Sequence, residues 1–133
     1  MFEIQGKVAI VTGGANGIGK EAVKAILAKG GVPVIADFNE ELGNQTAGEL
    51  NVEFIKVDVS DEGQVKEMVS HVVEKYGHLD IMVANAGIGG GGSTLELSTE
   101  EYEKYIGVNQ NGVFYCSREA IRQMVAQGTG GAV

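Results

Sequence analysis

Short apolar runs alternate with longer segments of helical periodicity along this chain of 133 residues. The runs are KVAIVT (7–12), VPVIAD (32–37), VEFIKVD (52–58) and IMVANAG (81–87). Continuous β-branched runs are typical of parallel strands that are covered on both faces, and strands that alternate with helices form repeated βαβ units. The alternation therefore predicts a three-layer α/β fold. Right-handed crossovers and a reversal after the third strand predict the strand order 3-2-1-4, a doubly wound parallel sheet.

The segments between these runs predict helices over about 20–30, 40–50, 61–76 and from 98 to about 127. Gly30 is expected to cap the first helix at its C-terminal end. Ser98 and Glu101 have the spacing of a capping box. A break is expected near Gly107 to Gly112, where two glycines fall inside the helical pattern. Pro33 fits only near the start of its strand or at an edge, because proline cannot donate to the ladder.

The charge balance excludes two classes of partner. With 18 acidic against 10 basic residues, the chain has a net charge of −8, which disfavours nucleic acid and anionic membranes as main partners. No apolar run approaches the roughly 20 residues of a membrane helix. The N-terminus lacks the pattern of a signal peptide, and a single cysteine cannot form an internal disulfide. These features predict a cytoplasmic protein in which Cys116 is a small buried hydrophobic residue.

The stretch TGGANGIGKE (12–21) matches two different phosphate-binding loops. Gly14, Gly19 and Lys20 stand where the nucleoside-triphosphate loop GxxxxGK[ST] requires them, but Glu21 replaces the hydroxyl residue. That hydroxyl would ligate Mg²⁺, whereas a carboxylate there lies close to anionic oxygens. The match to this loop is therefore interpreted as accidental.

The other match is GxGxxA, formed by Gly17, Gly19 and Ala22. In dinucleotide-binding units this pattern brings the backbone close to a pyrophosphate at the N-terminus of a helix. The strand before the loop and the helix after it supply the required context. The alternative is an ordinary tight turn between strand and helix, which would not need so many glycines.

Asp37 ends the second strand, eighteen positions after Gly19. A carboxylate there can accept hydrogen bonds from an adenosine ribose and repel a 2′-phosphate. Neither Asn16 nor Phe38 is a basic residue that could neutralise such a phosphate, so NAD is favoured over NADP. The alternative is that Asp37 caps the helix whose segment begins at Asn39, and both roles can coexist.

Two further polar residues at strand ends each allow two interpretations. Asp58 either accepts from the amino group of adenine, with Val59 packed beside the ring, or is a turn aspartate ahead of Ser60. Asn85 either satisfies neighbouring backbone groups or faces the cofactor. The residues alone do not decide between these alternatives.

The remaining candidates favour structural roles. His71 and His78 have no partners at metal-ligand spacing, so no metal site is predicted and both are interpreted as solvated surface histidines. The charges from Glu96 to Lys104 are interpreted as a solvated helix face. The loop GIGGGGST (87–94) is expected to be mobile because glycine restricts its backbone little.

Taken in order, TGGANGIG, Asp37, Asp58–Val59, the NAG motif at 85–87 and Asn109 make the sequence resemble the short-chain dehydrogenase/reductase family over essentially the whole chain. The family motif TGxxxGxG is matched without departure by Thr12, Gly13, Gly17 and Gly19. The resemblance implies a Rossmann-type fold and an NAD-dependent oxidoreductase.

The resemblance also implies roles for individual residues. For Asp58 it favours the interpretation that this residue binds the cofactor. Its cofactor-binding set is Gly13, Asn16, Gly17, Ile18 and Gly19 at the pyrophosphate and adenosine, Asp37 at the ribose, Asp58 and Val59 at adenine, and Asn85, Ala86 and Gly87 near the nicotinamide. Asn109 is similar to the family's catalytic asparagine, which lies at a helix kink and helps to hold a water in a proton relay. The alternative is a kink residue that bonds its own backbone.

The family's chemistry also needs a serine, a tyrosine and a lysine four residues after that tyrosine. The residues four positions after the tyrosines of this chain are Asp80, Ile106, Asn109 and Glu119, so Tyr-x-x-x-Lys does not occur. The chain alone is therefore predicted to be inactive.

The last residues, GTGGAV, are typical of a loop and the first step of a fifth strand. An end there would leave an apolar edge on the fourth strand. We expect residues 1–133 to be a single dinucleotide-binding domain, truncated at the start of the fifth strand and prone to self-association as a homo-oligomer. The expected function is the NAD(H)-binding part of an oxidoreductase that interconverts a secondary alcohol and a ketone. The alternative is a non-catalytic dinucleotide-binding or assembly module.

Overall fold

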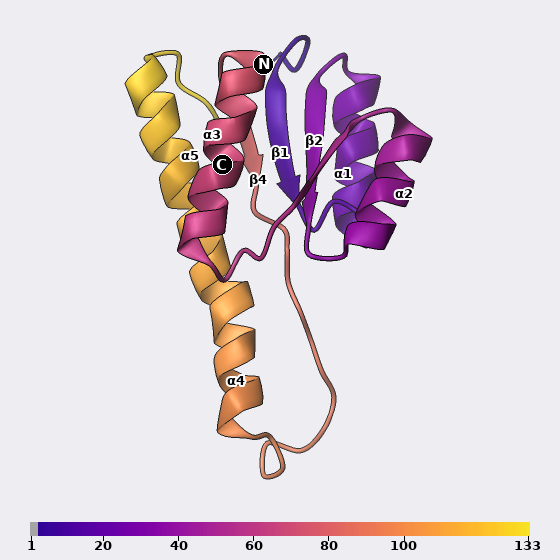
Figure 1. Cartoon of the computed structure of the whole chain (residues 1–133), viewed down its shortest axis with the longest axis vertical. Coiled ribbons are helices and arrows are strands. Elements are labelled where there is room, and N and C mark those ends of the chain that lie inside the picture. The colour runs from indigo at the N-terminus through magenta and orange to yellow at the C-terminus, as the bar shows by residue number, and fades with distance from the viewer. Residues whose placement is uncertain (1–2) are drawn as a thin grey trace.

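The four predicted strands form one parallel sheet in the order β3-β2-β1-β4, as the alternation of runs predicts. A computed structural model of the chain describes residues 3–133 (Figure 1). The strands are β1 (Val8–Thr12), β2 (Val32–Asp37), β3 (Glu53–Lys56) and β4 (Ile81–Val83). The third and fourth strands are shorter than predicted, because the chain leaves the sheet before Asp58 and Asn85 and carries both residues in loops.

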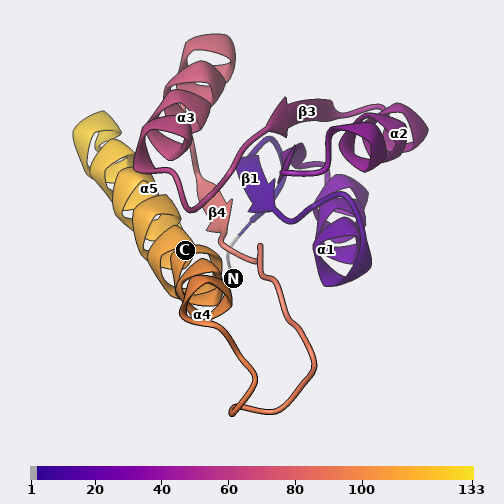
Figure 2. The same ribbon diagram turned by 60° about the horizontal axis from the view of Figure 1, so that its bottom comes forward.

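Helices cover both faces of the sheet, which confirms the three-layer prediction (Figures 1 and 2). Helices α1 (Gly17–Ala28) and α2 (Glu40–Leu50) lie on one face, and α3 (Glu62–Tyr76) and α5 (Val113–Gln127) lie on the other. Helix α4 (Thr99–Ile106) precedes α5 and projects beyond the sheet, with no buried residue of its own.

All five residues of β1 are buried, because this strand lies inside the sheet with helices on both faces. Val8 and Ile10 pack into the core under α3 and α5, whereas Ala9 and Val11 pack into the core under α1 and α2. Side chains alternate between the faces of a strand, so a strand covered on both faces must be apolar throughout. The uninterrupted apolar run from Val8 to Val11 in the sequence therefore reflects the place of β1 inside the covered sheet.

The predicted helix signals are present in the structure. Gly30 adopts a φ of +74° directly after Lys29, the C-cap of the first helix. Ser98 and Glu101 form the reciprocal hydrogen bonds of a capping box at the start of α4. Pro33 pairs only with β1, since the pairing with β3 starts one residue later. The expected break is a π-helical turn, η1 (Gly107–Gly112), between α4 and α5.

Helix α1 begins at Gly17, three residues earlier than the apolar periodicity predicts. The end of the glycine-rich loop therefore belongs to the first turn of the helix. At the other end of the chain, Ala132 forms a parallel bridge with Ile81 and accepts a hydrogen bond of 3.0 Å from Met82 N. No helix between residues 3 and 133 is both long and apolar enough to cross a lipid bilayer.

Candidate functional site

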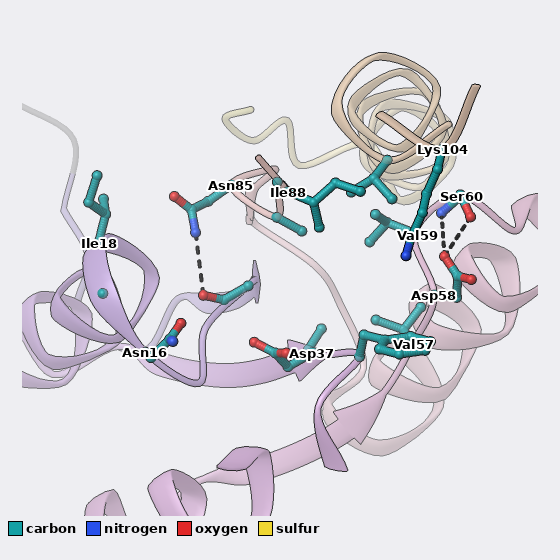
Figure 3. A pocket seen from close by; sticks show the side chains of 17 residues that line it. Asn16, Ile18, Asp37, Val57, Asp58, Val59, Ser60, Asn85, Ile88 and Lys104 are labelled. Atoms are coloured by element: carbon teal, nitrogen blue, oxygen red, sulfur yellow. Dashed lines mark hydrogen bonds between the residues drawn. The ribbon is translucent and has the colours of Figure 1, made fainter. Parts of the chain in front are cut away.

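A pocket of about 490 Å³ lies at the carboxyl ends of the strands, where sheets of this type bind their ligands (Figure 3). The structure brings together ten of the predicted site residues around it: Gly13, Asn16, Gly17, Ile18, Asp37, Asp58, Val59, Asn85, Ala86 and Gly87. Two predicted residues, Gly19 and Asn109, do not line the pocket. Gly19 lies in the first turn of α1, next to Gly17 and Ile18, and Asn109 hydrogen-bonds the backbone of Ile88.

The glycines of the loop are required for different physical reasons. Gly13 and Gly17 have φ angles of +65° and +53°, a region that side chains disfavour. A Cβ on Gly13 would also lie 2.9 Å from the Cα of Ala86. Gly19 has an ordinary φ, but a Cβ there would overlap the carbonyl group of Gly13. The first two glycines shape the turn, and Gly19 permits close packing of helix α1 beneath it.

The N-terminus of α1 is open toward a ligand. Asn16 occupies the N-cap position, but its side chain makes no capping hydrogen bond. The hydrogen bond from Lys20 N to Asn16 O, 3.0 Å long, closes the first turn. The amides of the three preceding helical residues have no intrahelical acceptor. These amides and the positive end of the helix dipole form a site for an anion.

Lys20 and Glu21 do not contribute to the pocket. Lys20 Nζ forms an ion pair of 2.6 Å with Glu49 on α2, and Glu21 pairs with Lys24 on the same helix. The lysine of a nucleoside-triphosphate loop must instead reach the phosphates. This geometry agrees with the interpretation that the match to that loop is accidental.

Asp37 fixes the turn between β2 and α2. Its Oδ2 accepts from Ala15 N at 3.1 Å, and its Oδ1 accepts from Asn39 N at 3.0 Å. The N-cap of α2 is Asn39, whose side chain accepts from Leu42 N, so the capping role considered for Asp37 belongs to Asn39. The carboxylate of Asp37 has further lone pairs and lines the pocket.

Asp58 has the turn role that the sequence allows and still lines the pocket. Its Oδ1 accepts from the backbone N and the Oγ of Ser60, at 3.0 and 2.6 Å. Its Oδ2 has no hydrogen-bond partner among residues 3–133. The two interpretations of Asp58 are therefore compatible, because one oxygen serves the turn and the other is open.

Asn85 satisfies backbone groups of the glycine loop. Its Nδ2 donates to Thr12 O at 3.1 Å and to Gly13 O at 3.4 Å. The hydroxyl of Thr12 in turn accepts from the amides of Asn85 and Ala86, both at 3.0 Å. The bonds of Asn85 confirm the alternative that it satisfies neighbouring backbone groups, whereas the part of the Thr12 hydroxyl was not predicted. The sequence signal for Thr12 is a polar residue at the end of the otherwise apolar first strand.

Asn109 holds the loop after β4. Its Oδ1 accepts from Ile88 N and its Nδ2 donates to Ile88 O, each at 2.8 Å. The alternative that Asn109 bonds the backbone of its own helix is therefore wrong. The π-helical turn around it packs closely on the β3 end, since a Cβ on Gly112 would lie 2.7 Å from a methyl group of Val59.

Some pocket residues were not identified from the sequence: Ala36, Phe38, Val57, Ser60, Ile88, Lys104 and Val108. Phe38 follows Asp37 and is 70% exposed, which is unusual for a large aromatic side chain. Lys104 lies in the charged segment that was expected to be solvated, and this segment is exposed. Its side chain is exposed but lines the pocket from α4 (Figure 3).

His71 is exposed, as expected, whereas His78 is half-buried, and each pairs with a carboxylate. His71 Nε2 lies 2.6 Å from Glu53, and His78 Nε2 lies 3.0 Å from Asp80. Between residues 3 and 133, no group of His, Cys, Asp and Glu has the arrangement of a metal site. Cys116 is buried, and its burial raises the pKa of the thiol to about 12. It therefore lacks the thiolate that a reactive cysteine needs.

Glu53 is the carboxylate whose pKa is shifted most strongly, and it lies away from the pocket, at the start of β3. Burial by itself would raise the pKa of Glu53. Hydrogen bonds from Tyr76, Lys75 and His71 outweigh burial and lower this pKa to about 2. The cluster joins α3 to the sheet, so we assign it to stability.

The parallel sheet, the glycine loop and the pocket at the strand ends define a Rossmann-type nucleotide-binding protein. Residues 7–133 match the family described as short chain dehydrogenase. The chain belongs to the short-chain dehydrogenase/reductase family.

Individual relatives agree with this assignment. Short-chain dehydrogenase reductase 3a of Arabidopsis thaliana is 42% identical over 99% of this chain and 53% of its own length. A family member from Burkholderia phymatum, solved in complex with NAD, has a TM-score of 0.92 at 32% identity, over 98% of this chain and 48% of its own.

A third comparison is with 3-ketoacyl-(acyl-carrier-protein) reductase from Brucella melitensis, solved in complex with NADH. It has a TM-score of 0.89 at 32% identity, over 94% of this chain and 52% of its own. The chain thus spans about half the length of the relatives that it matches.

Proposed function

We propose that this chain is the NAD(H)-binding part of a short-chain oxidoreductase that interconverts a secondary alcohol and a ketone by hydride transfer. The observation that carries the proposal is the position of the Asp37 carboxylate. It lies at the end of β2, in the same pocket as the glycine loop and the uncapped end of α1. This combination suits an adenosine ribose joined to a pyrophosphate.

The phosphate end of the proposed site fits the group that it would hold. Gly13 and Gly19 leave a cradle in which any added Cβ would meet backbone atoms. In this proposal Gly13, Asn16, Gly17, Ile18 and Gly19 contact the pyrophosphate and adenosine. The open amides of the first helical turn hold the phosphate oxygens.

The preference for NAD over NADP rests on charge. Asp37 can accept from ribose hydroxyls, and its negative charge repels a 2′-phosphate. Asn16 and Phe38, which flank this position in the pocket, bring no positive charge. The NAD and NADH bound in the two related structures support this choice.

At the other positions, Asp58 and Val59 contact the adenine in this proposal, and Asn85, Ala86 and Gly87 lie beside the nicotinamide. Asn109 supports the proton relay of the family. Each of its polar side-chain atoms makes one hydrogen bond with Ile88. One amide hydrogen and one lone pair remain to hold a water.

The second candidate function is a non-catalytic dinucleotide-binding or assembly module. Both candidates require NAD binding and differ in turnover. In either case we propose a homo-oligomer, because α4 buries none of its residues. Sedimentation of the 133-residue chain tests this, and a monomer at high concentration would contradict it.

Fluorescence titration with NADH and NADPH tests the proposed function. NADH should bind more tightly than NADPH, and Gly13→Val should abolish binding of both, since the side chain would enter the cradle. Gly128→Val is the matched control, because Gly128 also has a positive φ but has open space around it. No saturable binding of NADH by the folded chain would refute the proposal.

A further inference from the structure

The chain contains two Asn-Gly pairs, Asn16–Gly17 in the glycine loop and Asn111–Gly112 in the π-helical turn. Asparagine is a thermolabile residue, because the next backbone nitrogen can attack its side-chain amide. A glycine in the next position makes this attack easiest, since it has no side chain to obstruct the approach. The attack also needs a backbone that can rotate and an amide nitrogen that is not held in a helical hydrogen bond. The two pairs differ in both respects.

The first pair meets these requirements. The backbone of Asn16 is extended, with φ of −151° and ψ of −179°, and its exposed side chain makes no hydrogen bond between residues 3 and 133 (Figure 3). Gly17 is the first residue of α1, so its N–H has no intrahelical acceptor. A Cβ built on Gly17 would meet no heavy atom within 4 Å, so the backbone is not crowded there.

The second pair does not meet them. Asn111 and Gly112 both belong to η1, where backbone amides donate to carbonyl groups of the preceding turn. Gly112 is buried, has helical angles of −59° and −44°, and packs against Val59. Cyclisation at Asn111 would have to open this turn. The pair therefore offers the same chemistry in a protected setting, as a reference inside the same chain.

We propose that Asn16 is a deamidation site whose conversion inactivates the dinucleotide pocket. The nitrogen of Gly17 forms a bond to Cγ of Asn16, and the side-chain amide leaves as ammonia with the proton that Gly17 gives up. Water then opens the cyclic imide, and the nitrogen of Gly17 regains a proton. Attack of water on Cγ gives aspartate. Attack on the backbone carbonyl carbon gives isoaspartate, in which the main chain runs through Cγ.

Either product places a carboxylate at residue 16, which lines the pocket at the start of α1. Aspartate is as good an N-cap as asparagine, and a negative charge there is favourable for the helix dipole. The fold therefore tolerates the change to aspartate. The same charge repels the phosphates of a dinucleotide. This loss of binding rests on the proposed function, whereas the covalent step does not.

Peptide mapping by mass spectrometry tests the covalent step. The chain is incubated in mildly alkaline buffer made with heavy-oxygen water, once folded and once in denaturant. Cleavage after lysine and arginine gives peptides 8–20 and 105–118, which separate the two pairs. In the folded chain Asn16 should convert at least about tenfold faster than Asn111, because cyclisation at Asn111 must await local unfolding. Each product should carry heavy oxygen, and denaturant should bring the two rates together.

Fluorescence titration with NADH before and after the incubation tests the consequence. The binding-competent fraction should fall in step with the conversion of Asn16, and NADH present during the incubation should slow that conversion. Asn16→Asp should remain folded by circular dichroism and bind NADH at least about tenfold more weakly, through charge repulsion. Asn16→Ser has no amide to lose and should keep its own starting affinity through the incubation. Asn111→Ser should lose affinity at the same rate as the unaltered chain.

Equal conversion of the two asparagines in the folded chain, or none at Asn16, would overturn the modification site. Conversion of Asn16 without loss of NADH binding would overturn its consequence. In both cases the fresh chain still binds NADH, so the proposed function survives. Absence of NADH binding to the fresh, folded chain would instead defeat the proposed function, and the peptide map would still decide whether Asn16 is the converted residue.

Discussion

Removing the Asp37 carboxylate should reduce the preference for NADH over NADPH. In the proposed site this carboxylate accepts hydrogen bonds from the ribose and repels a 2′-phosphate. Asp37→Ala should therefore weaken the binding of NADH and remove the charge repulsion that opposes the binding of NADPH. Loss of a hydrogen bond to a charged group corresponds to about 1.5 to 3 kcal/mol. The dissociation constant of NADH should therefore rise about 10- to 150-fold.

The structure adds a second cost to this substitution. Asp37 also accepts from Ala15 N at 3.1 Å and Asn39 N at 3.0 Å, so alanine leaves two loop amides without their acceptor. Asp37→Asn separates the two effects, because the amide oxygen retains one of these bonds while the charge is removed. Its NADPH affinity should rise with less loss of stability than in the alanine variant.

Fluorescence titration with both cofactors measures the ratio of the two dissociation constants. Asp61→Ala is the control, since it removes the same charge from the N-cap of α3, where Asp61 accepts from Gln64 N at 3.1 Å. It should cost about 1 kcal/mol of stability and leave the ratio unchanged. Equal affinity of the unaltered chain for NADH and NADPH would refute the reasoning.

Three other predictions follow from the same structure. Gly19→Ala should lower the free energy of unfolding by about 1 to 3 kcal/mol and weaken NADH binding, because the methyl group overlaps the Gly13 carbonyl; Gly48→Ala, which meets open space, should not destabilise the chain in denaturant titrations. The pKa of Glu53 falls from 4.5 to about 2 on folding. The ionised carboxylate therefore contributes its full stability above about pH 4.5, and this contribution is lost as the pH falls toward 2. Glu53→Gln should flatten this part of the acid-unfolding profile, and an unchanged profile would contradict the assignment of the Glu53 cluster to stability. The chain alone should not reduce NAD⁺ with secondary alcohols. These 133 residues contain no Tyr-x-x-x-Lys to act as acid and base, and general acid–base catalysis contributes about 10² to 10⁴ in rate. Turnover that survives repurification and is abolished by Asn109→Ala would show that other residues do the chemistry.

Much of the fold could be predicted because its signals are local. The buried strand Val8–Thr12 appears as an unbroken apolar run, and the π-helical turn appears as two glycines within a helical pattern. The strand ends were harder to predict. Apolar residues continue past Val83 into the loop, because Ala84 and Ala86 pack on the core without belonging to the sheet.

Pocket residues that follow a strand could be predicted from the sequence. Pocket residues that reach the site only through tertiary folding could not. Asp37 and Asp58 are found by their place after apolar runs. Lys104 lies on α4, well after the end of β4 along the chain, and the charge pattern around it is that of a solvated face. The partner of Asn109 could not be predicted either, because Ile88 lies 21 positions away and reaches it only through the π-helical turn.

We propose above all that a dinucleotide lies across the carboxyl ends of the strands, with its pyrophosphate at the start of α1. The most direct measurement is an amide-resolved NMR titration of the chain with NADH. We expect saturable shifts of the amides of Gly17, Ile18 and Gly19 and of those around Asp37 and Asp58, with little change around Glu53. Saturable shifts confined to other surfaces, or none at these five positions, would contradict it.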